Sequence, residues 1–190
     1  MHITKQEIRK EILKKRAGLD EKERERAEVL VTERILGHQW FYLSDTLLCF
    51  VNYGTEISTE AIWTEALRLG KKVYMPKVQL GVNGPEMQFY RIYGKNDLSV
   101  GYKGIYEPDE KQELFLYDKE ACEKVLMLMP GVAFDVYKNR IGYGKGFYDK
   151  YLTGKEALQL KTIGIGYACQ IVPEIPYDKN DIKPDQVICM

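Results

Sequence analysis

A short glycine-rich stretch carries most of the candidate chemistry of this chain. Residues 139–151 read NRIGYGKGFYDKY, with glycines at alternate positions, Gly142, Gly144 and Gly146. Residues 142–146 are called the glycine run below. Glycines let backbone N–H groups approach an anion closely, and Arg140 and Lys145 could neutralise phosphate charge. The spacing is neither the dinucleotide fingerprint nor the P-loop, because Phe147 stands where the P-loop needs a hydroxyl. The stretch indicates a phosphate-binding loop or, alternatively, a tight strand-to-helix turn.

A carboxylate, Asp149, follows the last of these glycines by three residues. It could be an oxygen ligand of Mg²⁺, which takes few carboxylates together with substrate phosphates. It could equally be a first-turn acid that complements the dipole of the helix expected from Phe147 onward. The spacing alone leaves both interpretations open.

The scarcity of histidine narrows the class of reaction. The two histidines, His2 and His38, lie beside neither the glycine run nor a pair of carboxylates. A histidine-ligated metal site and a Ser-His-Asp triad are therefore not expected. Chemistry carried by Lys, Arg, carboxylates and backbone N–H groups favours phosphoryl transfer, in which positioning and charge neutralisation do most of the catalysis.

The composition is typical of a packed globular protein. The 190 residues suit one domain, residues 1–190, and 45% are hydrophobic and 29% charged. Lys and Arg number 28, as do Asp and Glu, which argues against wholesale binding of nucleic acid or a membrane surface. No apolar run approaches the roughly 20 residues of a membrane span, and residues 1–15 lack the apolar core of a secretory signal. We expect a cytoplasmic monomer.

The cysteines agree with a reducing compartment. None of the four belongs to a CxxC pair, and three lie in apolar surroundings. This usage indicates reduced, mostly buried thiols rather than a disulfide framework. The residues are Cys49, Cys122, Cys169 and Cys189.

The first third of the chain predicts helices and a βαβ unit. A helix is expected over residues 4–17, with six Lys or Arg against two Glu between Lys5 and Arg16. A second helix runs from an Asp20 N-cap, with Glu23 completing a capping box, to about Leu36. A buried strand over 46–53, a helix over 58–70 capped by Ser58, and a strand over 72–78 then follow.

The remainder continues the alternation of strands and helices. Residues 87–93 have the alternating pattern of an antiparallel strand, residues 94–120 look irregular, and residues 125–134 form an apolar run expected as the central strand. The glycine run, a helix from Phe147 and a strand over 162–168 come next. This order predicts an α/β fold whose sheet is covered on both faces. Ligands in such folds bind beyond the carboxyl ends of the strands, where the glycine run is expected.

The stretch MPGVAFDVYKNRIGYGKGFYDKYL resembles the signature of the 5-formyltetrahydrofolate cyclo-ligase family. KQEIRKEILKKR is similar to the family's N-terminal helix with its Lys-x-x-x-Arg pair, and NYGTEISTEAI to the segment with its substrate-binding Glu. GIYEP and IPYDKNDIKPDQVI complete five segments in the right order across nearly the whole chain. The resemblance implies a three-layer α/β/α sandwich around a mostly parallel mixed sheet, with an N-terminal helical pair. It also implies conversion of 5-formyltetrahydrofolate and ATP to 5,10-methenyltetrahydrofolate, ADP and phosphate, with Mg²⁺ as cofactor.

The resemblance also implies a role for each matched residue. The catalytic groups would be Arg140 and Lys145. ATP would be bound by Lys5, Arg9, Arg140, Gly142, Gly144, Gly146 and Tyr148. The reduced folate would be bound by Val51, Glu56, Tyr143, Gly144, Lys145, Gly146 and Phe147. Mg²⁺ would be bound by Asp149 and Asp181.

Simpler interpretations remain open for several of these residues. Lys5 and Arg9 are four apart and share a helix face, which could be only a solvated basic face. Glu56 could be one of the acids common just before a helix. Members of the family often have tyrosine at the position of Phe147, so ring stacking but no hydroxyl chemistry is expected there. The alternatives for the whole chain are another α/β enzyme using ATP or a sugar phosphate, and a nucleic-acid-binding module using the basic helix, with steep salt dependence.

Overall fold

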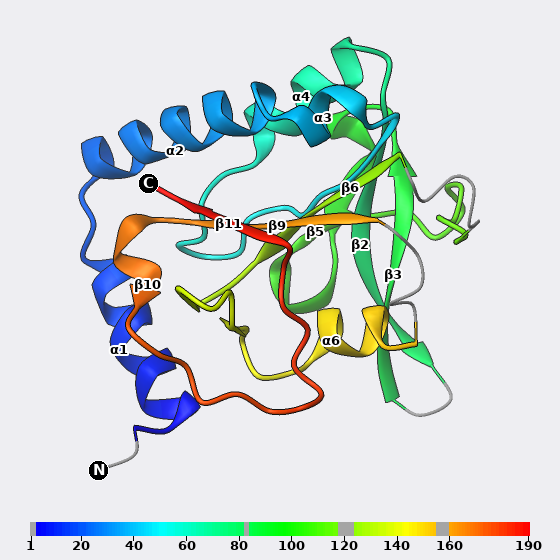
Figure 1. The fold of residues 1–190 in the computed structure, drawn as a ribbon. Coiled ribbons are helices and arrows are strands. Elements are labelled where there is room, and N and C mark those ends of the chain that lie inside the picture. The colour runs from blue at the N-terminus through cyan, green and yellow to red at the C-terminus, as the bar shows by residue number, and fades with distance from the viewer. Residues whose placement is uncertain (1–2, 82–83, 118–123, 155–159) are drawn as a thin grey trace.

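A computed structural model describes residues 3–81, 84–117, 124–154 and 160–190. Six strands form the main sheet, in the order β11-β9-β6-β1-β2-β3 (Figure 1). Their bounds are β1 Thr46–Leu48, β2 Lys72–Gly81, β3 Gly84–Ile92, β6 Val125–Pro130, β9 Lys161–Gly166 and β11 Gln186–Cys189. Neighbouring strands are parallel except for β3, which pairs antiparallel with β2. The mostly parallel mixed sheet is therefore confirmed.

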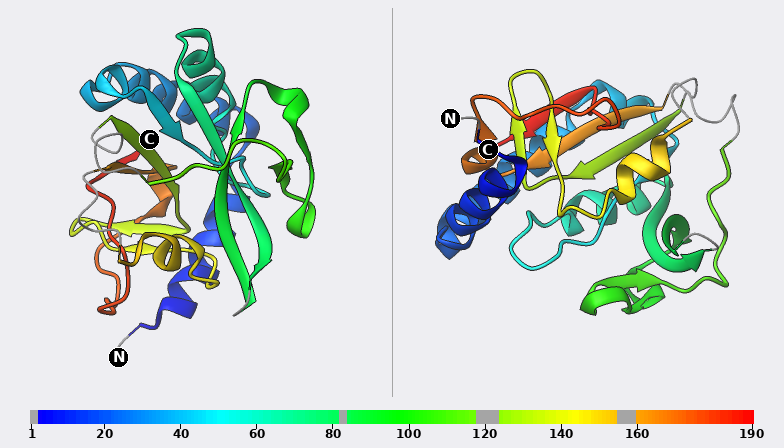
Figure 2. Two further views of the ribbon diagram at one scale, coloured as in Figure 1. Left: turned by 90° about the vertical axis from the view of Figure 1, so that its right-hand side faces the viewer. Right: turned by 90° about the horizontal axis from the view of Figure 1, so that it is seen from below.

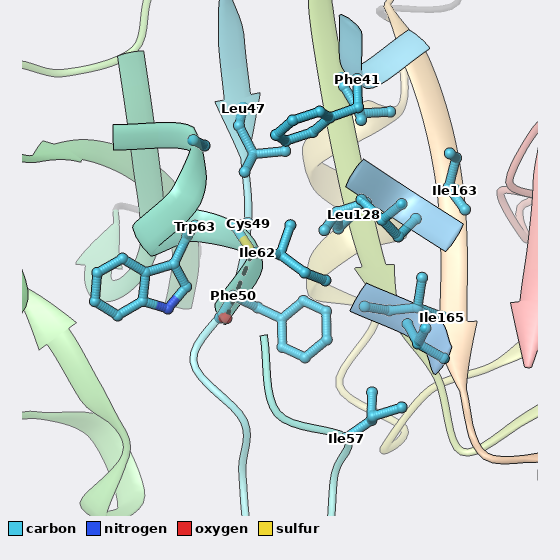
Figure 3. Packing of buried hydrophobic residues seen from close by; sticks show 14 of the residues in the cluster. Phe41, Leu47, Cys49, Phe50, Ile57, Ile62, Trp63, Leu128, Ile163 and Ile165 are labelled. Carbon is cyan, nitrogen blue, oxygen red and sulfur yellow. Dashed lines mark hydrogen bonds between the residues drawn. The ribbon is translucent and has the colours of Figure 1, made fainter. Parts of the chain in front are cut away.

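Helices cover both faces of this sheet. On one face lie α2 (Glu21–Leu36), α3 (Gln39–Leu43) and α4 (Glu60–Arg68), whereas α6 (Phe147–Leu152) packs on the other (Figure 1). Figure 3 shows Phe41 and Ile62, from the first set of helices, packed over Leu47 and Leu128 of the strands. The predicted three-layer α/β/α arrangement is thus observed, and in the described residues the helical layer on the second face consists of the short helix α6.

The two N-terminal helices are present but pack on different parts of the molecule. α1 (Lys5–Ala17) begins at the Thr4 capping box and α2 at the predicted Asp20 capping box. α2 lies on the main sheet, whereas α1 lies against a small sheet of β10 (Ile171–Val172), β7 (Ala133–Asp135) and β8 (Arg140–Ile141). Ile8 and Ile12 of α1 are buried there. The apolar side of α1 therefore packs on residues that precede or follow the glycine run in the chain, namely Val132, Ala133, Ile141 and Ile175.

A two-stranded arm stands beside β2 (Figure 2). It consists of η1 (Lys95–Asp97), β4 (Leu98–Val100), η2 (Tyr102–Gly104) and β5 (Tyr106–Pro108). The buried carboxylate of Glu107 accepts hydrogen bonds from the backbone N–H of Val78 and of Tyr102, both over 3.2 Å. This carboxylate ties the arm to β2, so the segment expected to be irregular has a defined position.

Two predicted strands are shorter than expected. The run 46–53 leaves the sheet after Leu48, because the Phe50 carbonyl accepts the Thr59 hydroxyl instead of a partner strand. The run 125–134 is divided into β6, which ends at Pro130, and β7, which begins at Ala133, with Gly131 and Val132 between them. A Cβ on Gly131 would stand 2.4 Å from the Phe134 ring, so this close turn requires glycine. The glycine run consequently follows the β7–β8 hairpin and not the central strand β6.

Smaller differences concern element ends. The helix expected from Ser58 begins at Glu60, after Thr59, whose hydroxyl donates a hydrogen bond to the Phe50 carbonyl. The Ser58 hydroxyl accepts the Glu60 N–H over 3.3 Å. The strand expected over 162–168 is β9, which is followed by η3 (Ala168–Gln170). The thiol of Cys122 lies outside the described residues. Within the described ranges, no helix has the length and apolarity needed to span a membrane.

Candidate active site

A cavity of about 530 Å³ lies between the start of α1, the loop after β1, the arm and the glycine run. Every residue to which the sequence assigned a site role lines this cavity, with the exception of Asp181. Residues more than a hundred positions apart in the chain therefore meet at one place. The sequence pattern alone could not show this, because the contact between α1 and the glycine run is tertiary.

The backbone of the glycine run requires glycine at two positions. Gly144 has φ +92° and Gly146 has φ +64°, both in the region that side chains disfavour. A Cβ on Gly144 would also lie 3.6 Å from the guanidinium of Arg9. The Nε of Arg9 donates a hydrogen bond to the carbonyl oxygen of Gly142 over 2.8 Å. The run is thus held directly against α1.

Both cations of the Lys-x-x-x-Arg pair take part in the cavity wall. Arg9 is bonded to the glycine run, and Nζ of Lys5 forms an ion pair with Asp181. Neither side chain lies on a fully solvated face, because each is half-buried at the cavity. Lys10, by contrast, is on the exposed side of α1. The basic bias of this helix therefore has two parts, one facing the cavity and one facing water.

Arg140 and Asp149 form the most buried charged pair of the cavity. The Arg140 side chain is 4% exposed, and its Nη2 donates to Oδ1 of Asp149 over 2.8 Å. The same Oδ1 accepts the backbone N–H of Ile182 over 3.1 Å. The next residue back is Asp181, so the two carboxylates assigned to the metal belong to the same corner of the molecule.

These two carboxylates fit Mg²⁺ as part of a nucleotide complex. Mg²⁺ usually takes one or two carboxylates, substrate phosphates and waters. Asp149 and Asp181 supply two oxygen donors, each now paired with a cation, Arg140 or Lys5. In the described part of the chain, no group of three or more His, Cys, Asp or Glu could hold an ion by itself. The donor set therefore suits a metal that arrives with phosphate rather than a resident one.

Glu56 is a buried acid that also lines the cavity. Its side chain accepts the backbone N–H of Tyr53 over 2.8 Å, which closes a short turn before α4. Burial raises the pKa of this carboxyl from 4.5 to about 7. The Tyr53 N–H, the charge of Arg16 and the hydroxyl of Tyr143 act in the opposite direction. The group is therefore close to half-ionised at neutral pH.

Three buried polar atoms in residues 139–150 have no partner among the described residues. They are Oδ1 of Asn139, Nε of Arg140 and the hydroxyl of Tyr148. Burial raises the pKa of Tyr148 well above its usual value, so the group remains a neutral donor. Buried polar groups are nearly always hydrogen-bonded. Of these three residues, Arg140 and Tyr148 line the cavity, which makes their two atoms the candidates for contact with a ligand.

The comparisons with known proteins agree with this geometry. The model of the 5-formyltetrahydrofolate cyclo-ligase family matches residues 2–190. The chain belongs to this family. The mouse 5-formyltetrahydrofolate cyclo-ligase is 28% identical over 99% of this chain and 94% of its own, and that of Escherichia coli K12 is 26% identical over 92% and 93%.

Solved structures confirm the cyclo-ligase fold. The 5,10-methenyltetrahydrofolate synthetase of Aquifex aeolicus has a TM-score of 0.79 and 32% identity, covering 97% of this chain and 89% of its own. The synthetase of Mycoplasma pneumoniae has a TM-score of 0.75 at 23% identity, covering 98% of both chains. The family membership expected from the five sequence segments is therefore confirmed.

The cyclo-ligase cavity also contains residues that the sequence did not single out. The arm contributes Tyr102, Lys103 and Glu107, and a second cavity of about 450 Å³ adjoins the first at Val51 and Tyr53. The most informative omission is Arg16, which is 1% exposed and reaches the hydroxyl of Tyr143. Its spacing of seven residues from Arg9, two helical turns, is a signal that could have placed it on the same face.

Proposed function

We propose that the protein converts 5-formyltetrahydrofolate to 5,10-methenyltetrahydrofolate with consumption of ATP and release of ADP and phosphate. The observation that carries this proposal is the union, in one cavity, of phosphate-binding groups and a buried carboxylate. Lys5, Arg9, Arg140 and the glycine run supply positive charge and backbone N–H groups, and Glu56 supplies the carboxylate. Family membership independently favours the same pair of substrates.

The positive groups suit a triphosphate. Arg140 is held at the base of the cavity by Asp149, and Arg9 is held by the Gly142 carbonyl. Preorganised cations of this kind stabilise the charge that develops on a transferring phosphoryl group, because they do not have to reorient. Lys145 lies on the same loop and lines the same cavity. When bound through Asp149 and Asp181, Mg²⁺ would neutralise further charge on the phosphate oxygens.

Glu56 suits the pterin ring of a reduced folate. The amide-amidine edge of a pterin presents two parallel N–H donors, and an ionised carboxylate accepts both. The carboxylate of Glu56 is buried and oriented by the Tyr53 N–H, so little ordering is left for the ligand to impose. The ring of Phe147 lines the cavity and can stack on a flat ligand, whereas it offers no hydroxyl.

The reaction follows from these positions. The oxygen of the N5-formyl group attacks the γ-phosphorus, and the bond from this phosphorus to ADP breaks. The product is an imidate phosphate, whose phosphate is a good leaving group. N10 of the folate then attacks the same carbon, phosphate departs, and N10 loses its proton as the ring closes. The cavity has to hold the formyl oxygen, the γ-phosphorus and N10 in line, and the chain needs no histidine base for any step.

The test is a direct assay. The protein is mixed with 5-formyltetrahydrofolate, ATP and Mg²⁺, and the near-ultraviolet absorbance of the methenyl product and the release of ADP are followed. We expect both signals to rise together, with one ADP per product. Lys10→Ala, on the exposed side of α1, serves as a control that should keep the activity. Folded protein that gives neither signal would falsify the proposal.

We further propose that residues 1–190 act as one domain and that the enzyme works as a cytoplasmic monomer on small-molecule substrates, without nucleic-acid or membrane partners. The balanced charge of the chain, with 28 basic and 28 acidic residues, supports the absence of nucleic-acid and membrane partners. The half-buried positions of Lys5 and Arg9 support the same point, because these cations are not on a fully exposed basic face. Size-exclusion chromatography with light scattering tests the oligomeric state.

A further inference from the structure

One side chain of α1, that of Arg16, does not line the cavity but lies behind the part of its wall that contains Glu56 and Tyr143, here called the folate end. Taking the proposed function as given, we propose that Arg16 is a positioning residue for the reduced folate. It fixes Tyr143 and the turn that carries Glu56, and it supplies the buried positive charge that acts on the Glu56 carboxylate. Neither the family pattern in the sequence nor the cavity lining assigns a role to this arginine.

The contacts of Arg16 join three separate segments. Nε donates to the hydroxyl of Thr55 over 2.9 Å, and Nη1 donates to the carbonyl oxygen of Gly131 over 3.5 Å. Nη2 donates to the hydroxyl of Tyr143. Thr55 immediately precedes Glu56, and Tyr143 belongs to the glycine run. The guanidinium thus holds two walls of the folate end against each other.

The charge of Arg16 is unusual because its hydrogen-bond partners are neutral. The residue is 1% exposed, and no carboxylate in the described part of the chain forms an ion pair with it. A buried guanidinium without a compensating negative charge is costly. The carboxylate on which its charge acts is Glu56. Arg16 and Glu56 therefore interact through charge, although no hydrogen bond or ion pair joins them.

The other groups around Glu56 cannot replace this charge. From its own turn Glu56 receives the Tyr53 N–H. From the glycine run and α6 it faces the phenols of Tyr143 and Tyr148, whose pKa values lie above their usual value because both are buried. These phenols stay neutral at physiological pH. Arg16 is thus the positive group that opposes the effect of burial on the pKa of Glu56, which lies at about 7.

The protonation state of Glu56 decides whether the pterin edge of the folate faces two hydrogen-bond acceptors or an acceptor and a donor. An ionised carboxylate accepts both N–H groups of the pterin edge, whereas a protonated one presents a donor to a donor. Loss of the Arg16 charge would raise the pKa of Glu56 further, so that the acid would be mostly protonated at neutral pH. Arg16 therefore links the helix that carries the phosphate-binding cations to the ionisation of the folate-binding carboxylate.

The test is the pH dependence of folate binding in Arg16→Gln. Binding of 5-formyltetrahydrofolate alone is measured by calorimetry between about pH 6 and pH 9. For the wild type we expect affinity to rise as the pH passes through about 7. For Arg16→Gln we expect the rise to move to higher pH and the affinity at neutral pH to fall on the order of tenfold. The affinity for ATP, measured separately, should be unchanged.

Two further variants separate charge from structure. Ile12→Val weakens the packing of α1 one turn earlier, at a residue 1% exposed, without touching any charge; it should leave the pH profile in place. In the double variant Arg16→Gln/Glu56→Gln, loss of the contacts of Arg16 with Tyr143 and Thr55 should weaken folate binding by the same factor at every pH, because the pH-dependent part of the Arg16 effect passes through Glu56. A pH-dependent loss relative to Glu56→Gln alone would overturn the proposal.

The outcomes distinguish this proposal from the proposed function. A wild type that binds no 5-formyltetrahydrofolate overturns both. A wild type that binds it, with Arg16→Gln showing the same affinity and pH profile, overturns only the role of Arg16. If Arg16→Gln does not fold, Arg16→Lys carries the test, since it keeps the charge but not the fork. We then expect an unshifted pH midpoint with weaker binding, and unaltered binding would overturn the proposal.

Discussion

The guanidinium of Arg140 donates a hydrogen bond to Oδ1 of Asp149 over 2.8 Å, from a side chain that is only 4% exposed. Removal of Asp149 would therefore leave a nearly buried cation unpaired. We expect Asp149→Ala to lower turnover severely and to lower the free energy of unfolding by about 3–5 kcal/mol. Urea unfolding and turnover at limiting Mg²⁺ are the measurements.

Asp149→Asn is the matched control for that prediction, because it keeps an oxygen acceptor for Arg140. We expect it to recover part of the stability while turnover stays low. If Asp149 only complemented the helix dipole, Asp149→Ala would cost about 0.3–1 kcal/mol and leave turnover normal. A small stability loss with normal turnover would thus contradict both the pairing and the metal role.

Glu56→Gln should weaken folate binding far more than ATP binding. The amide keeps the size of the side chain and one acceptor, but it loses the charge and presents a donor to the pterin. A loss of roughly 2–5 kcal/mol in folate binding is expected for a broken charge-assisted contact of this kind. Calorimetry with each ligand separately measures it, and an unchanged folate affinity would place the pterin elsewhere.

The same substitution should change the pH dependence of stability. The folded-state pKa of Glu56 is raised from 4.5 to about 7 by burial, so folding opposes its ionisation. Below pH 4.5 the acid is protonated in both states and costs nothing; the cost grows as the pH rises from 4.5 to about 7, where only the unfolded state is ionised, and stays constant above that. Glu56→Gln should therefore stabilise the protein at high pH relative to low pH, on the order of 3 kcal/mol. Thermal unfolding at several pH values shows whether that difference exists.

Arg9→Glu should raise the apparent KM for ATP and leave folate binding nearly untouched. The guanidinium of Arg9 is bonded to the Gly142 carbonyl, at the phosphate end of the cavity. Lys10→Glu makes the same charge change one residue later on the exposed side and should have little effect. Hydrogen exchange of residues 4–16 should slow on addition of Mg-ATP in the wild type and not in Arg9→Glu. Equal effects of the two variants would show that net charge alone matters.

Gly144→Ala and Gly154→Ala form a second matched pair. Both glycines have positive φ, +92° and +76°, so each substitution strains the backbone by roughly 1–2 kcal/mol. A methyl group on Gly144 would stand 3.6 Å from the Arg9 guanidinium, an ordinary van der Waals distance, and one on Gly154 would meet nothing within 4 Å, so neither substitution should clash. We expect both to lower the melting temperature but only Gly144→Ala to raise the KM for ATP, because Gly144 lines the cavity and Gly154 does not. Parallel losses of activity would show that general destabilisation, and not the place of Gly144 in the cavity wall, is the cause.

Tyr148→Phe isolates the hydroxyl that has no partner among the described residues. Because a buried unpaired hydroxyl contributes nothing favourable, its removal should leave stability unchanged or raise it by about 1 kcal/mol. If the hydroxyl contacts the nucleotide, as the family resemblance implies, the KM for ATP rises at the same time. A loss of stability would instead indicate that the hydroxyl is bonded within the protein.

Local sequence patterns were sufficient for part of this fold. The capping box at Asp20 and the helical periodicity predicted α2 correctly. The helix expected to begin at Phe147, directly after the glycine run, is also observed, as α6. The run 125–134 predicts one strand because its other residues are apolar, although the dipeptide Pro130-Gly131 within it is a common turn signal. The break at Gly131 depends on the Phe134 ring, which also lies where a Cβ of Gly164 would be. That packing is tertiary and leaves no periodic signal.

The site shows the same division. The glycine run could be predicted from its composition. Glu56 was identified only through the resemblance to the family, because an acid just before a helix is common. Arg16 was counted as one of six basic residues of α1, although its spacing of four residues from Ile12 places it on the buried face of the helix, away from the exposed Lys10. What the spacing does not show is the set of polar partners, Gly131 and Tyr143, that makes its burial possible. The raised pKa of Glu56 depends on the burial of its own carboxyl, a tertiary property that is invisible in the sequence.

The position of α1 has a consequence for the order of folding. This helix packs on β7 and η3, and Lys5 is paired with a residue 176 positions later. Contacts of such long sequence separation form late, because the loop they close must first be ordered. The partners of α1 lie around residues 132–142 and 168–181, so its packing is complete only when both segments are present. The cavity is therefore among the last features to assemble, so that its capacity to bind a ligand signals that the whole chain has reached its native topology.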